Sequence, residues 1–150
     1  MSDLRELYQE VILDHNKKPR NYGKLDCATC EAQGFNPLCG DRVCVYLKMK
    51  DGQVEDVAFE GKGCAICIAS ASMMTQTMKG RRAEDARKVF AQFHDLVTGK
   101  GCPGGVAAEL GKLAAFSGVS EYPARVKCAT LAWHTFSAAM DGKDSTVSSE

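Results

Sequence analysis

Three cysteines stand where strands and helices are expected to meet loops, and they are the residues best suited to chemistry. Cys39 lies in the turn FNPLCGDRV, Cys64 opens a helix of small residues, and Cys128 lies near the start of the last helix. A helix N-terminus presents free N–H groups and a partial positive charge, which favour thiolate over thiol. Because thiolates bind metals and attack as nucleophiles, these positions predict one of those two chemistries.

A carboxylate accompanies the thiols, since Asp41 follows Cys39 by two residues. Together the four side chains offer three sulfur atoms and one oxygen, a donor set that suits tetrahedral zinc. Gly40 and Gly63 flank two of the thiols and allow close backbone approach. Aspartate is a weaker zinc ligand than a fourth thiolate, so such a site could exchange a ligand. Taken singly, each residue fits packing or turn capping better, and the prediction rests on the set.

Two CxxC pairs predict an alternative site. Cys27 with Cys30 and Cys64 with Cys67 would supply the four thiolates of a structural zinc ribbon. Against this, Cys67 lies one turn into an apolar helix, and a complete hairpin separates the two pairs. Cys67 is therefore expected in the core. For Cys27 and Cys30 three interpretations stay open: a redox pair, a second metal site, or two unrelated exposed thiols.

No chemistry is assigned to the other cysteines or to the histidines. Cys44 is expected in the core and Cys102 on the surface, in a glycine-rich loop. His15 is expected at a helix end, where the helix dipole favours its charge. His94 is expected on a solvated helix face, and His134 is expected to be partly buried with its polar atoms satisfied.

Alternating and helical periodicity outline the elements that must position these residues. Residues 42–50 and 53–60 alternate apolar and polar side chains, and Asp51-Gly52 between them predicts a hairpin turn. Helices are predicted for the first turns of the chain up to Pro19, for residues 65–78, for the segment after Gly80, and for 107–116 and 124–140. The predicted fold class is α+β, a small antiparallel sheet with helices packed on one face.

Composition limits the organisation and the partners of the chain. Its 150 residues suit a single domain, taken as residues 1–140, with a polar tail at 141–150 expected to be disordered. With 45% hydrophobic residues, 25% charged residues and a net charge of +0, we expect neither nucleic acid nor membrane as a partner. The N-terminus lacks a signal-peptide core, so a cytoplasmic location is expected. Eight cysteines are many for such a reducing compartment, which favours metal or sulfur chemistry.

Four blocks of sequence resemble a known family. They are LYQEVILDHNKKPRN (7–21), NPLCGDRV (36–43), FEGKGCAICIASASMMT (59–75) and RVKCATLAW (125–133). In this order they resemble the SufU branch of the NifU/IscU-type iron-sulfur cluster assembly proteins, and the resemblance extends to about Met140.

The resemblance implies a zinc site formed by Cys39, Asp41, Cys64 and Cys128. It further implies a zinc-dependent sulfurtransferase of the SUF system, whether this is counted as an enzyme or as a stoichiometric carrier. A SufS-like, pyridoxal-phosphate-dependent cysteine desulfurase would deliver persulfide sulfur to Cys39 after a partner ligand displaces that thiolate from zinc. A downstream iron-sulfur scaffold would receive the sulfur.

Scaffold members of the same family suggest the alternative, a [2Fe-2S] cluster assembled on Cys39, Cys64 and Cys128. Those members resemble this chain but carry histidine directly before the last cysteine, where this chain has Lys127. They also have a shorter connection between the second and third cysteines than the one containing residues 83–105 here. Lysine cannot replace a neutral imidazole ligand, so the difference favours sulfur transfer. Arg125 and Lys127 are expected to balance the anionic site or to guide docking.

Overall fold

A four-stranded sheet organises the molecule. The computed structural model describes residues 2–26, 28–37, 40–98, 113, 115–116, 118–119, 122–141 and 146–148. In this part of the chain the strand order is β3-β2-β1-β4. The strands are β1 (Cys30–Asn36), β2 (Asp41–Lys50), β3 (Gln53–Lys62) and β4 (Thr146–Ser148). β1, β2 and β3 are antiparallel, and β4 pairs in parallel with β1 at the edge.

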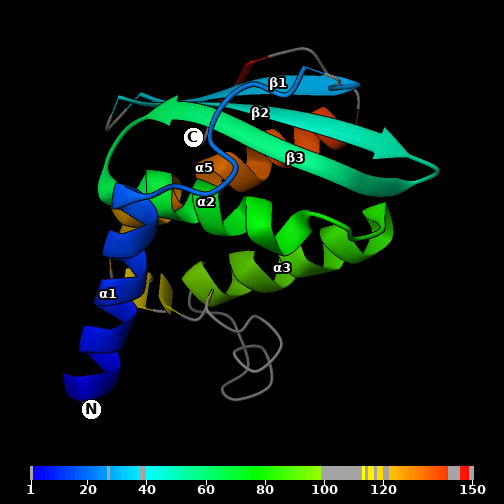
Figure 1. Cartoon of the computed structure of the whole chain (residues 1–150). Coiled ribbons are helices and arrows are strands. Elements are labelled where there is room, and N and C mark those ends of the chain that lie inside the picture. Colours follow the sequence, from blue (N-terminus) through cyan, green and yellow to red (C-terminus); the bar gives the residue numbers. More distant parts are fainter. Residues whose placement is uncertain are drawn as a thin grey trace.

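Helices cover one face of this sheet, as the predicted α+β class requires (Figure 1). They are α1 (Ser2–Lys17), α2 (Ala65–Met78), α3 (Ala83–Thr98) and α5 (Pro123–Met140). Helix α5 packs against β1 and β2, and α2 packs against β3. Helix α3 lies on the far side of this layer, and α1 crosses one end of α2 (Figure 1). None of the described helices lies on the opposite face of the sheet, which we call the open face (Figure 1).

The hairpin between β2 and β3 confirms its prediction from sequence. Asp51 and Gly52 both have positive φ angles, 54° and 77°, as a two-residue type I′ turn requires. The turn brings Lys50 opposite Gln53 and fixes the register of both strands. Both strands extend slightly beyond the predicted ranges, β2 by one residue at its start and β3 by two at its end.

Sequence analysis missed β1 and β4. The inward positions of β1 are Ala32, Gly34 and Asn36, which lack the bulk that marks a half-buried strand. A Cβ atom at Gly34 would collide with the Thr135 side chain of α5, so this glycine lets helix and strand approach closely. The tail expected to be disordered contributes β4, and the sheet is therefore mixed at this edge.

Helices α2 and α5 are buried around most of their circumference, because both are apolar on nearly every side. Their bounds agree with the predicted ranges to within one residue. Trp133 of α5 stacks on Phe93 with ring centroids 4.2 Å apart, and its indole N–H donates to Ser70 Oγ at 2.9 Å. Most of the helix predicted at 107–116 lies outside the described residues, and Leu113 and Phe116 within it are buried.

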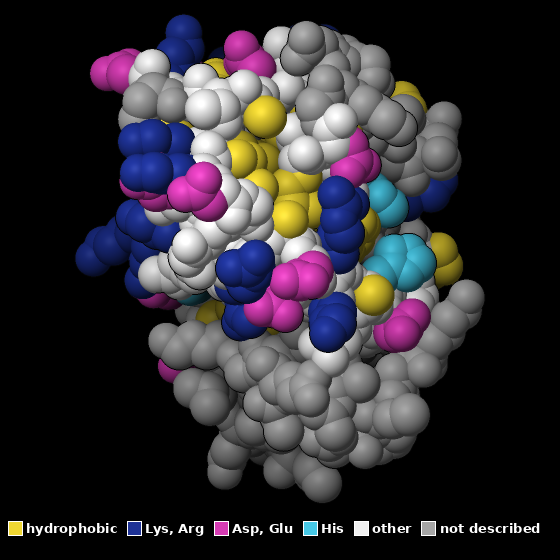
Figure 2. Space-filling model, turned by 90° about the vertical axis from the view of Figure 1, so that its right-hand side faces the viewer, with side chains coloured by type: hydrophobic (Ala, Val, Ile, Leu, Met, Phe, Trp, Pro, Cys, Tyr) yellow, Lys and Arg dark blue, Asp and Glu magenta, His cyan; other side chains and the backbone are white. Residues whose placement is uncertain are grey.

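Charged side chains of both signs alternate over the surface in view in Figure 2, around a strip of apolar side chains. This mixture accords with the formal net charge of +0. Among the described residues, no helix has both the length and the apolar character needed to cross a bilayer.

Candidate metal centre

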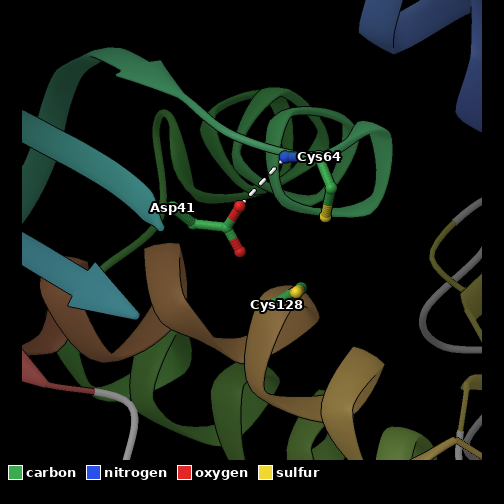
Figure 3. Close-up of side chains that lie close together, drawn as sticks. All are labelled: Asp41, Cys64 and Cys128. Carbon is green, nitrogen blue, oxygen red and sulfur yellow. Dashed lines mark hydrogen bonds between the residues drawn. The ribbon is translucent and has the colours of Figure 1, made fainter. Parts of the chain in front are cut away.

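Three predicted ligands, each from a different element, meet at one end of the sheet (Figure 3). Asp41 is the first residue of β2, Cys64 is the N-cap of α2, and Cys128 lies in the second turn of α5. One carboxylate oxygen and the two sulfur atoms all lie within 4.8 Å of one another. The fold therefore brings together one oxygen and two sulfur donors that are far apart in sequence.

The carboxylate of Asp41 is buried and held by N–H donors. Its Oδ1 atom accepts a hydrogen bond from the backbone N–H of Cys64 at 2.9 Å, across 23 residues of sequence. Its Oδ2 atom accepts from the side-chain amide of Asn36 at 3.3 Å. Asp41 therefore places its charge at the N-terminus of α2, where the helix dipole favours an anion. Capping of its own turn, the simpler role considered for Asp41, does not account for a hydrogen bond to a residue 23 positions away.

Gly63 makes room for that carboxylate. A Cβ atom at this position would collide with Oδ1 of Asp41. Only glycine allows the chain to pass from β3 into α2 this close to the carboxylate. The close backbone approach beside Cys64 is therefore to the Asp41 side chain.

The two thiols differ in accessibility. Cys128 is fully buried, and its sulfur accepts a hydrogen bond from the Asn36 amide at 3.6 Å. Cys64 is half-buried, so it lies nearer to solvent than the other two grouped residues. The centre thus has a closed side, formed by Asp41 and Cys128, and an accessible side at Cys64.

Asn36 is a residue of the candidate centre that sequence analysis missed. It is fully buried at the end of β1, and one side-chain amide donates to both Asp41 and Cys128. The one feature of the sequence that could have indicated Asn36 is its position directly before Pro37, in the segment that leads to Asp41. Because β1 has no clear apolar alternation, nothing in the sequence placed this side chain inside the fold.

Cys39, the fourth predicted ligand, lies outside the described residues. It belongs to the connection between Asn36 and Asp41, which pair across β1 and β2. The backbone N–H of Gly40 donates to the Asn36 carbonyl at 2.8 Å, and Gly40 has a φ angle of 72°. The two ends of this connection therefore lie at the metal centre.

The described donors fit a thiophilic divalent ion such as zinc. Two sulfur atoms and one carboxylate oxygen are all accepted by zinc, which takes four ligands in a tetrahedral arrangement. Among the described residues, no lysine or arginine forms an ion pair with Asp41, and the hydrogen bonds to this buried carboxylate come from neutral donors.

The alternative CxxC site is not assembled in the described part of the chain. Cys64 groups with Asp41 and Cys128, whereas neither Cys67 nor Cys30 joins the cluster. Cys67 is fully buried, as predicted for a core residue. Cys27 lies outside the described residues, so its pairing with Cys30 stays a prediction.

Arg125 and Lys127 precede Cys128 on α5. Arg125 is exposed and Lys127 is half-buried. Neither side chain forms an ion pair with another described residue. The roles of both cations in docking or charge balance stay predictions.

Cys44 corrects one expectation about the remaining thiols. It is half-buried on the open face of the sheet, with its sulfur 3.9 Å from a carboxylate oxygen of Glu31, and is not a core residue. Burial raises the pKa of the Cys44 thiol above its usual value. Cys44 is thus a poor nucleophile at neutral pH.

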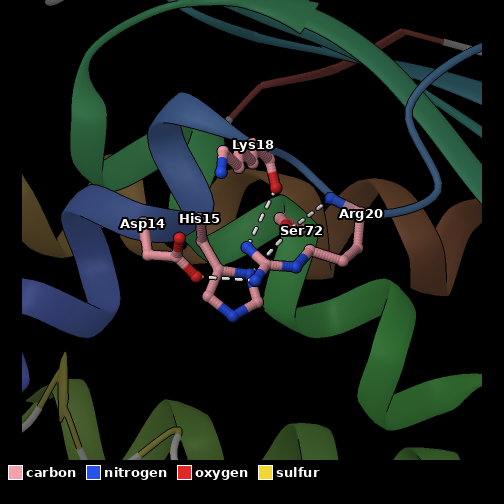
Figure 4. A network of polar contacts seen from close by, with 5 residues as sticks. All are labelled: Asp14, His15, Lys18, Arg20 and Ser72. Atoms are coloured by element: carbon pink, nitrogen blue, oxygen red, sulfur yellow. Dashed lines mark hydrogen bonds and ion pairs between the residues drawn. The ribbon is translucent and has the colours of Figure 1, made fainter.

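His15 belongs to a second polar cluster, which fixes α1 and the following loop to α2 (Figure 4). We call this cluster the clasp and define it as His15, Arg20, Asn21, Ser72 and Thr75. Nδ1 of His15 lies 2.7 Å from Ser72 Oγ, which also accepts the backbone N–H of Arg20 at 2.8 Å. The side chain of Asn21 donates to Thr75 at 3.0 Å. His15 lies in the last turn of α1, as predicted. Its ring is buried and contacts Ser72 of α2, so it helps to hold the two helices together.

His94 and His134 lie together on α3 and α5, with ring centroids 6.0 Å apart. Both pack edge-on against Phe90. Burial, followed by the charge of His94, lowers the pKa of His134. Neither histidine belongs to the metal centre, and His94 is half-buried, whereas a solvated position was expected.

Comparison with known proteins identifies the family. The NifU-like N terminal domain model matches residues 7–129. The chain is 46% identical over 132 residues to the zinc-dependent sulfurtransferase SufU of Bacillus subtilis, covering 88% of each chain. It is 39% identical over 140 residues to the iron-sulfur cluster assembly scaffold protein IscU of Streptococcus pyogenes, covering 93% of this chain and 86% of that one.

A solved structure agrees with the match. The crystal structure of FiSufU from Fervidobacterium islandicum AW-1 superimposes with a TM-score of 0.80 at 34% identity, covering 87% of this chain and 94% of the other. The family match spans the elements that carry Asp41, Cys64 and Cys128. This chain therefore belongs to the NifU-like N-terminal domain family, which includes SufU-type and IscU-type assembly proteins.

Proposed function

We propose that this protein is a zinc-dependent sulfurtransferase of iron-sulfur cluster assembly. The observation that carries the proposal is the convergence of Asp41, Cys64 and Cys128 at the ends of the connection that contains Cys39. The similarity to a SufU named as a zinc-dependent sulfurtransferase supports the same function. Cys39, Asp41, Cys64 and Cys128 would hold the zinc, which keeps cysteine sulfur in the thiolate form at neutral pH.

Sulfur transfer follows from thiolate chemistry at Cys39. The Cys39 thiolate attacks the outer sulfur of a persulfide carried by a cysteine desulfurase. The sulfur-sulfur bond of the donor breaks, the donor cysteine leaves as a thiolate, and Cys39 becomes the persulfide. The step needs no external oxidant or reductant, and it suits the reducing cytoplasm.

Asp41, Cys64 and Cys128 have the supporting role in this proposal. Their positions are fixed by three different elements, and hydrogen bonds hold Asp41 and Cys128 from the closed side. Three thiolates and one carboxylate around a divalent cation leave an excess of about two negative charges. Arg125 and Lys127, whose charges are uncompensated in the described part of the chain, would balance this excess or guide the sulfur donor.

A cluster scaffold is the second candidate, because relatives named IscU also match most of the chain. In that case Cys39, Cys64 and Cys128 would hold a [2Fe-2S] cluster and Asp41 would assist its release. The half-buried Lys127 stands directly before Cys128 and cannot serve as a neutral imidazole ligand. This residue favours sulfur transfer over the scaffold role.

Metal analysis of anaerobically purified protein is the first test. We expect one zinc per chain, without iron or sulfide, and loss of zinc in the Asp41→Ala and Cys128→Ala variants. Iron and sulfide in equal amounts would support the scaffold instead. If both variants retain their zinc, the CxxC cysteines are the better candidates for the zinc ligands.

Sulfur uptake is the second test. With a persulfide-loaded desulfurase, mass spectrometry should show one added sulfur atom on the wild type and none on Cys39→Ala. Cys44→Ala is the matched control, because the raised pKa of that thiol makes it a poor acceptor. Sulfur uptake by Cys39→Ala at the wild-type rate would contradict the proposal.

A further inference from the structure

The open face of the sheet carries a groove whose lining includes Arg42, the chain neighbour of Asp41. Its lining includes Tyr22, Phe35, Arg42, Cys44, Glu60 and Lys62, and its volume is about 550 Å³. We call it the outer groove. The described helices lie on the other side of the sheet, so none of them covers it (Figure 1).

Strand alternation ties the outer groove to the metal centre. Successive side chains of a strand point to opposite faces. Asn36 and Asp41 point inward to the centre and are fully buried, whereas their chain neighbours Phe35 and Arg42 point outward to the groove. Lys62 lines the same groove directly before Gly63. A protein that reaches the metal centre from solvent can therefore contact this groove as well.

The end of the groove nearest the metal centre carries two positive charges, Arg42 and Lys62. Arg42 and Lys62 pair across β2 and β3, where two like charges repel. Neither forms an ion pair with another described residue. The nearby carboxylate of Glu60 accepts a hydrogen bond from Tyr46 at 2.8 Å. A carboxylate supplied from outside would relieve the repulsion between Arg42 and Lys62.

Aromatic side chains line the same end of the groove in fixed positions. The Arg42 guanidinium lies 5.3 Å from the centre of the Phe35 ring. Tyr22 is 50% exposed, yet its hydroxyl donates to the Gly61 carbonyl at 3.0 Å and its ring packs edge-on against Phe59. A side chain already held by contacts within the protein loses less entropy on binding, and tyrosine and arginine are frequent at the centre of protein interfaces.

We propose that the outer groove docks an acidic segment of the protein that delivers sulfur to this one. The segment would place a carboxylate between Arg42 and Lys62 and an apolar side chain against Tyr22 and Phe35. This docking role rests on the proposed sulfurtransferase function, since the groove adjoins the ends of the connection that carries Cys39.

The test measures binding of a persulfide-loaded cysteine desulfurase to the full chain. We expect Arg42→Glu combined with Lys62→Glu to weaken the affinity at least tenfold at low salt, mainly through a slower association rate, and to flatten its salt dependence. The matched control is Lys50→Glu, an exposed lysine at the opposite end of β2, which should change the affinity less than twofold.

Two further readouts separate docking from chemistry. The double variant should keep its zinc, and it should accept sulfur from a small-molecule persulfide at the wild-type rate. Tyr22→Ala should also weaken desulfurase binding without loss of zinc. A normal rate at saturating desulfurase, with a raised KM, would support a pure docking role.

Several outcomes would overturn the docking proposal. They are unchanged affinity of the double variant, equal weakening by Lys50→Glu, and an effect confined to self-association or to a downstream sulfur acceptor. In each of them the sulfurtransferase function could still hold. A wild-type protein that binds zinc and takes sulfur from neither donor would instead refute the proposed function, and the docking role with it.

Discussion

The metal centre and the clasp both lie against α2, and their polar atoms are satisfied in different ways. In the clasp, the chain supplies matching groups, such as Ser72 Oγ facing both His15 and the backbone of Arg20. Beyond it, Arg20 also pairs with Asp14 at 2.6 Å, and that hydrogen bond lowers the pKa of the Asp14 carboxyl. The hydrogen bonds named for the clasp therefore all join groups of the protein.

The metal centre gathers acidic groups, and no described lysine or arginine forms an ion pair with its carboxylate. Asp41, Cys64 and Cys128 are all anionic when they bind a metal, and the hydrogen bonds that Asp41 accepts come from neutral donors, the side chain of Asn36 and the backbone of Cys64. Collecting negative charge in a buried place is unfavourable unless a cation compensates it. The comparison teaches that the clasp serves folding, whereas the metal centre is arranged for a ligand.

Removal of the metal gives the largest expected effect. Zinc present at about a thousand times its Kd stabilises the folded state by about 4 kcal/mol, which corresponds to roughly 8–16 °C in Tm for a domain of this size. Anaerobic thermal unfolding before and after chelation measures the loss, and added zinc should restore the Tm. If chelation leaves the Tm unchanged, the metal centre needs no bound metal for its stability and does not differ from the clasp in this respect.

Gly63→Ala should disturb the metal centre directly, because the new Cβ atom would collide with the Asp41 carboxylate. Overpacking of this kind costs about 1–3 kcal/mol. We expect a lower Tm and weaker zinc binding, measured by competition with a chromophoric chelator. Gly118→Ala is the matched control, since a Cβ atom there meets no atom within 4 Å. Equal effects of both substitutions would show that Gly63 has no special relation to Asp41.

Asn36→Ala should weaken zinc binding by about 10- to 100-fold, the usual cost of losing a group that orients metal ligands. The substitution removes the one amide that donates to both Asp41 and Cys128. Asn36→Asp should weaken it further, because a carboxylate donates no hydrogen bond and adds negative charge. The competition assay reports both variants. If Asn36→Asp binds zinc as well as the wild type does, Asn36 does not orient these ligands.

Ser72→Ala should give the smallest effect, a loss of about 1–2 kcal/mol of unfolding free energy, because it leaves His15 and the Arg20 backbone without their shared partner. Denaturant unfolding should show the same loss with and without zinc, and zinc affinity should stay unchanged. Ser137→Ala, a half-buried serine on α5, serves as the control. A change in zinc affinity would mean that the two clusters are coupled through α2.

Much of the fold was predictable because its signals are local. Strict alternation and Asp51-Gly52 predicted the hairpin, and the apolar run from Ala65 to Met78 predicted α2 at its observed bounds. β1 was not predictable, because Ala32, Gly34 and Asn36 provide no apolar period. Its place depends on α5 packing closely over Gly34, which is a contact between distant parts of the chain.

The sequence by itself determined the residue types of the candidate site and their places at element boundaries, since turns, glycines and periodicity act over a few residues. It also determined the family, through blocks that extend over most of the chain. Only the tertiary structure decided that Asp41, Cys64 and Cys128 meet, that Cys67 and Cys30 stay apart from them, and that Asn36 holds two of them. The physical reason is that these contacts span up to 92 residues and arise from the packing of α2 and α5 on the sheet, which no local pattern encodes.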